Sequence, residues 1–311
     1  MNTLAITVLA VLLLGYFTLA ARDVGLGMLL PVVARHPADR RRAFAAMAPY
    51  FLGTEVWLVA AIGVVAGVFP ILKGELLAWS WPLLIALAVS WLVRDAGLWF
   101  WALTQHPRPR GAWAGAVALG SWGLAGTWGL VLGGILTGGT TVSVAGALVA
   151  GCVVVLFALS GAAFGAERLV ASGADAAHSP AADLAGEATR WLSRGGVALV
   201  ALAAVGTALL SRETVERPLV ATVLLAVVVV CLAMTAGTNG PRWSAHSSAL
   251  AMAAAIALVV TAVNLPGLVA DPASMRLVGF AVAPVVPLMV VGQLWLYRAL
   301  RRPVTTGGYF A

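Results

Sequence analysis

Residues 143–166 read SVAGALVAGCVVVLFALSGAAFGA, a run of 24 residues without a charged side chain. A transmembrane helix needs about 20 predominantly apolar residues. In the hydrocarbon core of a membrane a single segment must satisfy its own backbone hydrogen bonds, which only a helix does. The stretch therefore predicts a membrane-spanning helix.

Further apolar stretches lie on both sides of this one. They run near 3–33, 48–69, 79–104, 113–136, 195–211, 218–236, 247–266 and 277–298. The whole chain of 311 residues is 61 % hydrophobic and 10 % charged, with a mean hydropathy of +0.98, whereas a soluble protein carries about 25 % charged residues. This composition excludes a secreted scaffold, a nucleic-acid-binding module and a cytosolic enzyme. We expect an all-α polytopic membrane protein with nine transmembrane helices.

Basic residues are distributed unevenly between the connections. Thirteen of the 19 lie on one side, in connections 34–47, 105–112, 167–194 and 237–246 and in the tail from 298. The other side carries only Lys73, Arg212, Arg217 and Arg276. Because Lys and Arg favour the cytoplasmic side of a membrane, this pattern predicts an outward N-terminus and a cytoplasmic C-terminus. It also accounts for the net charge of +7 without a nucleic-acid partner.

We interpret residues 1–311 as a single membrane domain. Five helices lie within 1–166, a cytoplasmic loop spans 167–190, and four helices lie within 191–311. The first 21 residues have no basic start and continue into apolar sequence, so we expect a retained helix and not a cleaved signal peptide. Cys152 and Cys231 fall inside predicted helices, where we expect small packing residues and not a disulfide.

The positions of the four histidines argue against a haem or a metal ion bound within the membrane by this chain. His36, His106, His178 and His246 all lie in or beside predicted cytoplasmic loops. A haem or a metal held within the membrane takes its ligands from the middle of helices. We therefore expect no haem and no metal in this chain, and no motif in it indicates a catalytic residue.

Five charged residues fall inside the first three predicted spans: Arg22, Asp23, Glu55, Arg94 and Asp95. By position along their helices, they lie at similar depth in the cytoplasmic half of the membrane. Unpaired ionisable groups at that depth are costly and usually mark a functional site or a partner. Two interpretations remain open here. The cluster is either a charge-compensated lock between three helices or a proton or cofactor site.

The span at 113–136 contains Gly120, Gly123, Gly126 and Gly129. Small residues on one face of a helix let a neighbouring helix approach closely. This spacing predicts close packing along that helix.

Four segments resemble subunit II of cytochrome bd-type quinol oxidases. Residues 22–31, RDVGLGMLLP, are similar to the family's DGFDLGVGMLLP, and an arginine-rich loop follows at 40–42. Residues 48–58, APYFLGTEVWL, resemble GPVWDGNEVWL, with Phe69-Pro70 at the family's spacing. Residues 286–298 resemble the closing VPIVLAYQIWVYRVF.

The resemblance implies two four-helix bundles plus a peripheral helix, in the plasma membrane of a bacterium. It also implies a haem-free accessory subunit of an oxidase that couples quinol oxidation to the reduction of oxygen to water. Haems b and d would lie in the partner, subunit I, whose assembly this chain would support. The position of Trp57 would border an oxygen path or the interface. A bound quinone from the quinone pool and a small single-helix subunit are further expectations.

This sequence departs from the family at several acidic positions. Ala20 replaces the first Asp of the helix 1 motif, Leu52 replaces the Asp of the WDGN stretch, and Thr54 replaces its Asn. Leu52 cannot carry a proton. Within the third span, Arg94 is retained from the family's RGVxFEFR, the Glu is lost, and Asp95 is new.

Two alternatives belong to other functional classes. The first is a secondary transporter that uses Asp23, Glu55 and Asp95 as its ion-coupling site, although such proteins favour internal repeats and we find none. The second is a scaffold subunit of another membrane complex.

Overall fold

The computed structural model describes residues 2–104, 106–139, 143–170, 179–211, 213, 215–236, 241–262 and 272–299. In this part of the chain lie the helices α1 (Asn2–Val33), α2 (Pro37–Val68), α3 (Pro70–Leu103), α4 (Pro107–Leu136), α5 (Val144–Arg168), α6 (Pro180–Leu210), α7 (Pro218–Ala236), α8 (Pro241–Ala262) and α9 (Pro272–Ala299). These nine are long and apolar enough to cross a membrane. The predicted all-α class with nine spans is confirmed.

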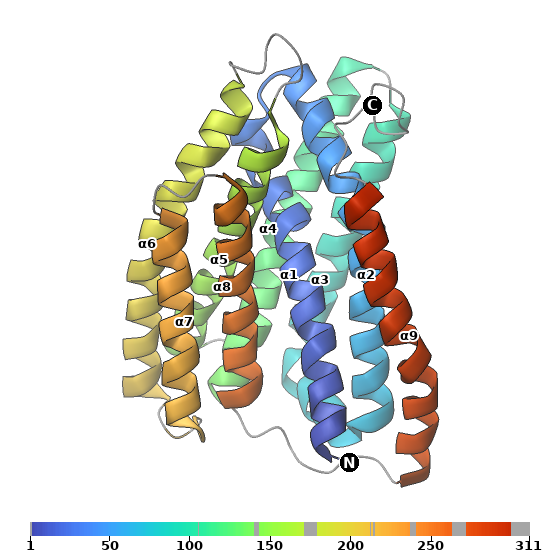
Figure 1. Cartoon of the computed structure of the whole chain (residues 1–311), viewed down its shortest axis with the longest axis vertical. Coiled ribbons are helices and arrows are strands. Elements are labelled where there is room, and N and C mark those ends of the chain that lie inside the picture. Colours follow the sequence, from blue (N-terminus) through green and yellow to red (C-terminus); the bar gives the residue numbers. More distant parts are fainter. Residues whose placement is uncertain are drawn as a thin grey trace.

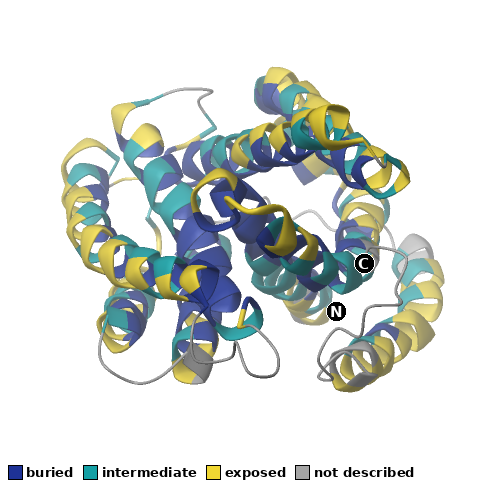
Figure 2. Cartoon of the chain, turned by 90° about the horizontal axis from the view of Figure 1, so that it is seen from above, coloured by how far each residue is buried: buried dark blue, intermediate teal, exposed yellow. Residues whose placement is uncertain are grey.

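The helices form two groups of four with one helix outside them (Figure 1). α1 to α4 pack together, and α5 to α8 make the second bundle. α1 and α4 both contact α5, which joins the two bundles, whereas α9 packs against α2 at the periphery. Seen from above, buried residues concentrate between the helices and exposed residues line the outside (Figure 2). The architecture thus agrees with the two bundles and peripheral helix that the resemblance implies.

Several helices begin earlier than their apolar stretches predict. α2, α3, α4 and α6 begin at Pro37, Pro70, Pro107 and Pro180, where hydropathy places the spans from 48, 79, 113 and 195. Proline suits the first position of a helix because it lacks an N–H group that would be unpaired there. Each of these helices begins with a segment that contains charged residues, ahead of the apolar core of its span. Consequently the loop expected over 167–190 is helical from Pro180 onward, while residues 171–178 lie outside the described residues.

The two bundles meet where glycines of α1 and α5 face one another. A Cβ atom at Gly25 would overlap the carbonyl oxygen of Phe157, and one at Gly161 would overlap the backbone of Gly25. Only glycine lets these two backbones approach so closely. Cys152 of α5 and Cys231 of α7 are both free thiols.

The glycines of α4 serve two different neighbours. Gly120 and Gly123 lie against α3, where a Cβ atom would meet Arg94 and Ser90, whereas Gly129 lies against Ala150 of α5. Nine residues are about two and a half turns of a helix, so Gly120 and Gly129 point in opposite directions. A Cβ atom at Gly126 would meet nothing within 4 Å. The predicted close packing holds for three of the four glycines, on two faces of the helix.

Candidate functional site

The first three helices bring together four of the five charged residues predicted to converge. Asp23 of α1 and Arg94 of α3 form an ion pair, with 2.6 Å between Oδ2 and Nη2. Arg94 also reaches Asp95, with 3.3 Å between Nη1 and Oδ1. The Asp95 carboxyl group lies near that of Glu55 on α2. The four side chains therefore form one connected group, which we call the polar cluster.

The four residues of the polar cluster differ in burial: Asp23 and Arg94 form an inner half, and Glu55 and Asp95 form an outer half. The side chains of Asp23 and Arg94 are 2 % and 4 % exposed, whereas that of Asp95 is 21 % exposed and Glu55 is half-buried. The second oxygen of Asp23 accepts a hydrogen bond from the amide of Val24 at 2.8 Å. The inner pair is thus desolvated and well bonded. The outer carboxyl groups reach the surface between α2 and α3.

Two aromatic residues complete the site, and we did not predict either. Trp91 donates from Nε1 to Oε1 of Glu55 at 3.1 Å. The hydroxyl group of Tyr16 accepts a hydrogen bond from Trp128 of α4 at 3.0 Å. Spacing could have indicated both residues. Trp91 lies four residues before Asp95 and Tyr16 lies seven before Asp23, which places each on the face of its charged neighbour.

Arg22 does not join the polar cluster. It makes none of the ion pairs found in the described part of the chain, and its Nε is buried without a hydrogen-bond partner there. Our expectation that both arginines would converge with the carboxyl groups is therefore met by Arg94 alone.

The other residues singled out by the resemblance lie close to the cluster along α1 and α2. Trp57 is 7 % exposed and packs against α1, where a Cβ atom at Gly15 would overlap its ring. Ala20 is fully buried beside Asp23. Leu52 belongs to α2, but its side chain lies outside the described residues.

A small cavity of about 20 Å³ lies inside the polar cluster. Tyr16, Ala20 and Asp23 of α1 line it together with Thr54 and Glu55 of α2. Trp91 and Arg94 of α3 and Leu124 of α4 contribute further walls. Val24 and Phe51 complete the walls, so the lining combines polar and apolar groups. Arg94 is one of the polar residues of this lining, and its Nε is buried without a hydrogen-bond partner among the described residues. The cavity has the size of one water molecule.

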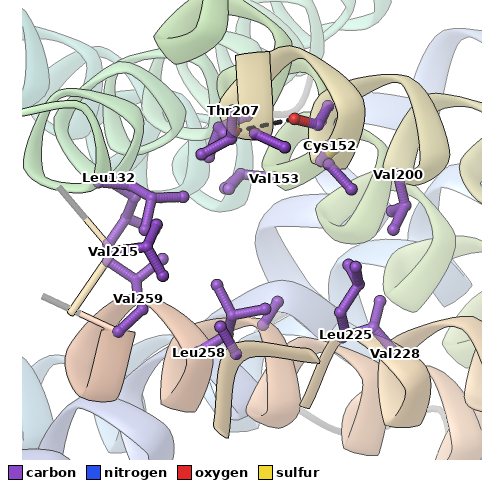
Figure 3. A pocket seen from close by; sticks show the side chains of 18 of the residues that line it. Leu132, Cys152, Val153, Val200, Thr207, Val215, Leu225, Val228, Leu258 and Val259 are labelled. Atoms are coloured by element: carbon purple, nitrogen blue, oxygen red, sulfur yellow. Dashed lines mark hydrogen bonds between the residues drawn. The ribbon is translucent and has the colours of Figure 1, made fainter. Parts of the chain in front are cut away.

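A second, much larger cavity of about 600 Å³ lies in the other bundle, between α4 and the helices α5 to α8 (Figure 3). Its walls are almost entirely Leu, Val, Ile and Ala side chains. Thr207 is one of its few polar residues, and its hydroxyl group donates to the carbonyl oxygen of Ala203 at 2.8 Å. Such a lining favours an apolar chain and offers few partners to a polar head group.

The described residues contain no group of three or more His, Cys, Asp or Glu side chains that could hold a metal ion. His36 and His106 directly precede α2 and α4, and His246 lies near the start of α8. His178 lies outside the described residues.

Comparison with known proteins relates the chain to one family along most of its length. Residues 1–300 match the family described as cytochrome bd terminal oxidase subunit II. Over 128 residues the chain is 27 % identical to a probable cytochrome oxidase subunit 2 of Haemophilus influenzae and to the cytochrome bd-I ubiquinol oxidase subunit 2 of Escherichia coli K12. Each match covers 41 % of this chain and 34 % of the relative, about a third of its length.

A solved structure shares the fold. The chain superposes on a chain of the bd oxidase from Geobacillus thermodenitrificans with a TM-score of 0.62 at 19 % sequence identity. The match covers 96 % of both chains.

Proposed function

The chain belongs to the family of subunit II of cytochrome bd terminal oxidases, and from this premise we propose that it is the haem-free accessory subunit of such an oxidase. In this proposal the partner is a haem-bearing subunit I that carries haems b and d, oxidises quinol and reduces oxygen. This chain supports the assembly of that partner and supplies no catalytic group. The complex lies in a bacterial plasma membrane, with the N-terminus of this chain outside and its C-terminus in the cytoplasm.

The observation that carries the proposal is the outer half of the polar cluster. Glu55 and Asp95 are only partly buried, at a depth where the surrounding helices are apolar. Next to them Val59 and Leu92 are 64 % and 71 % exposed. Ionisable groups are costly against lipid but acceptable against protein. We therefore assign the surface around Glu55, Val59, Leu92 and Asp95, the α2–α3 face, to the contact with subunit I.

The two halves of the polar cluster fit two different roles. Asp23 and Arg94 hold α1 to α3 as a buried ion pair, which supports the interpretation as a lock. Glu55 and Asp95 are two carboxyl groups that lie near one another, and neighbouring carboxyl groups can share one proton. The outer pair is thus suited to hold a proton at the surface that faces the partner. Trp57, buried against α1, remains our candidate for lining an oxygen path.

Within the described part of the chain, a large apolar cavity suits the chemistry of a bound quinone. The apolar cavity between α4 and α5 to α8 matches an isoprenoid tail in volume and lining. Solvent extraction of the purified complex, with chromatography and mass spectrometry, tests this assignment. One quinone per complex, lost when Ala203 is enlarged to Phe, supports it. An extract that contains only phospholipid contradicts it.

The assembly role is tested by omitting this chain. A host that produces subunit I without it should contain no assembled oxidase, measured as haem d absorbance in the membrane fraction. Re-supplying the chain should restore the signal. An intact and active oxidase formed in its absence would overturn the proposed function.

A further inference from the structure

We propose that the small cavity in the polar cluster is a binding site for a single water molecule, which joins Glu55 to the Asp23–Arg94 pair. The inference rests on the geometry of this chain and does not depend on the proposed function. Buried waters in proteins occupy polar cavities and make about three hydrogen bonds each. At about 20 Å³ the cavity exceeds the roughly 10–15 Å³ that one water needs.

The first hydrogen-bond donor to this water is Arg94. Its Nη1 and Nη2 are used by Asp95 and Asp23, whereas its Nε is buried and has no partner among the described residues. Arg94 lines the cavity and is 4 % exposed. An unsatisfied buried N–H group destabilises a fold, and the effect is larger on a charged group. A water oxygen in the cavity accepts from this nitrogen.

The second donor is Tyr16. Its hydroxyl oxygen accepts from Trp128, which leaves the hydroxyl proton to be donated. Tyr16 is 5 % exposed and lines the same cavity. The water oxygen has two lone pairs, so it can accept from Tyr16 and Arg94 together.

Two acceptors for the hydrogens of the water come from α2. Thr54 donates its own proton to the carbonyl oxygen of Tyr50, so its hydroxyl oxygen is available to accept. Glu55 receives one hydrogen bond, from Trp91, and its carboxylate has further lone pairs. Both residues line the cavity. The site therefore offers two donors and two acceptors, the full coordination of one water.

The bridging water ties the two halves of the polar cluster together. Through it Glu55 contacts Arg94 and Tyr16, so that α1, α2, α3 and, by way of Trp128, α4 share one hydrogen-bonded network. The small side chain of Ala20 in the cavity wall leaves the space that the water occupies. A larger side chain there would fill it.

A density map of this chain, alone or within a complex, at a resolution that shows ordered water, tests the site directly. We expect one peak in the cavity within hydrogen-bonding distance of Nε of Arg94 and the hydroxyl oxygen of Tyr16. A cavity without a peak, or a peak bonded to neither group, would overturn the proposal.

Paired substitutions give an independent test. Val and Thr have nearly the same shape, but Thr brings a hydroxyl group that can take the place of the water. Ala20→Val should therefore lower the melting temperature by several degrees more than Ala20→Thr. At Ala61, buried in the apolar core of α2 and absent from the cavity walls, the order should reverse. An Ala20→Val variant as stable as Ala20→Thr would show that no water is displaced and would overturn the proposal.

Discussion

Gly120 of α4 lies directly against the backbone of Arg94 in α3, so that a Cβ atom there would be 2.6 Å from the Arg94 amide nitrogen. The absence of a side chain at Gly120 lets the two helices touch at the level of the polar cluster. Gly97, one turn further along α3, likewise meets the backbone of α4 at Trp113. This crossing sets the position from which Arg94 reaches Asp23.

Gly120→Ala should destabilise the chain because the added methyl group must push α3 away from α4. Forcing extra volume into a packed contact costs about 1–3 kcal/mol, and the displacement acts on Arg94 directly. Gly126→Ala is the matched control, since nothing lies within 4 Å of a Cβ atom there. Thermal unfolding of the two purified variants compares them. Equal melting temperatures would contradict the importance of this crossing.

Arg94→Gln should be among the most damaging single changes, because it leaves the carboxylate of Asp23 buried without a partner. Breaking a buried ion pair on one side costs about 3–5 kcal/mol. Arg42 provides the comparison, since it pairs with Asp39 at 3.2 Å but is 39 % exposed, and surface pairs contribute about 0–1 kcal/mol. We expect little assembled complex with Arg94→Gln and a normal amount with Arg42→Gln.

A double variant tests whether Asp23 and Arg94 stabilise the chain as a pair. Asp23→Leu combined with Arg94→Met removes both charges and should recover part of the stability that Arg94→Gln loses. A double variant less stable than either single one would contradict a simple lock.

Glu55→Gln should reduce turnover or assembly more than the loss of any loop arginine. The amide oxygen of Gln can still accept from Trp91, so the helix contact survives, but the side chain can no longer hold or release a proton. Quinol-dependent oxygen consumption per haem d, compared with Arg42→Gln, measures the effect, and we expect a several-fold loss. Wild-type rates of oxygen consumption in both variants would show that Glu55 has no functional role.

Val59→Trp should weaken the association with subunit I because Val59 lies on the α2–α3 face, one turn from Glu55. Val223 of α7 is almost equally exposed, at 62 % against 64 %, but lies in the other bundle. Val223→Trp should therefore be tolerated in lipid. The yield of subunit I after affinity purification of this chain compares the two. An equal yield of subunit I with both variants would show that the α2–α3 face is not the interface.

Hydropathy predicted the existence of the nine spans, because each crossing needs its own apolar run. It placed the starts of α2, α3, α4 and α6 too late, because it reports the apolar core of a span and not the beginning of a helix. The prolines at 37, 70, 107 and 180 are the first residues of these four helices and could have indicated where they begin.

The polar cluster was predictable in part. Asp23, Glu55, Arg94 and Asp95 stood out because charges are rare within membrane spans. The ring nitrogen of Trp91 and the hydroxyl group of Tyr16 did not stand out in the sequence, because aromatic side chains in such helices usually pack against neighbouring helices. Whether they bond inside the cluster depends on how each helix is rotated, and that is set by contacts such as Gly120 with Arg94.

Gentle purification of the tagged chain in detergent tests directly whether it works as the accessory subunit of a bd-type oxidase. The preparation is characterised by a reduced-minus-oxidised optical spectrum and by identification of the chains that co-purify. We predict the bands of haems b and d together with a second large membrane subunit. A colourless preparation without a partner would contradict the accessory role, and the polar cluster would then need another explanation.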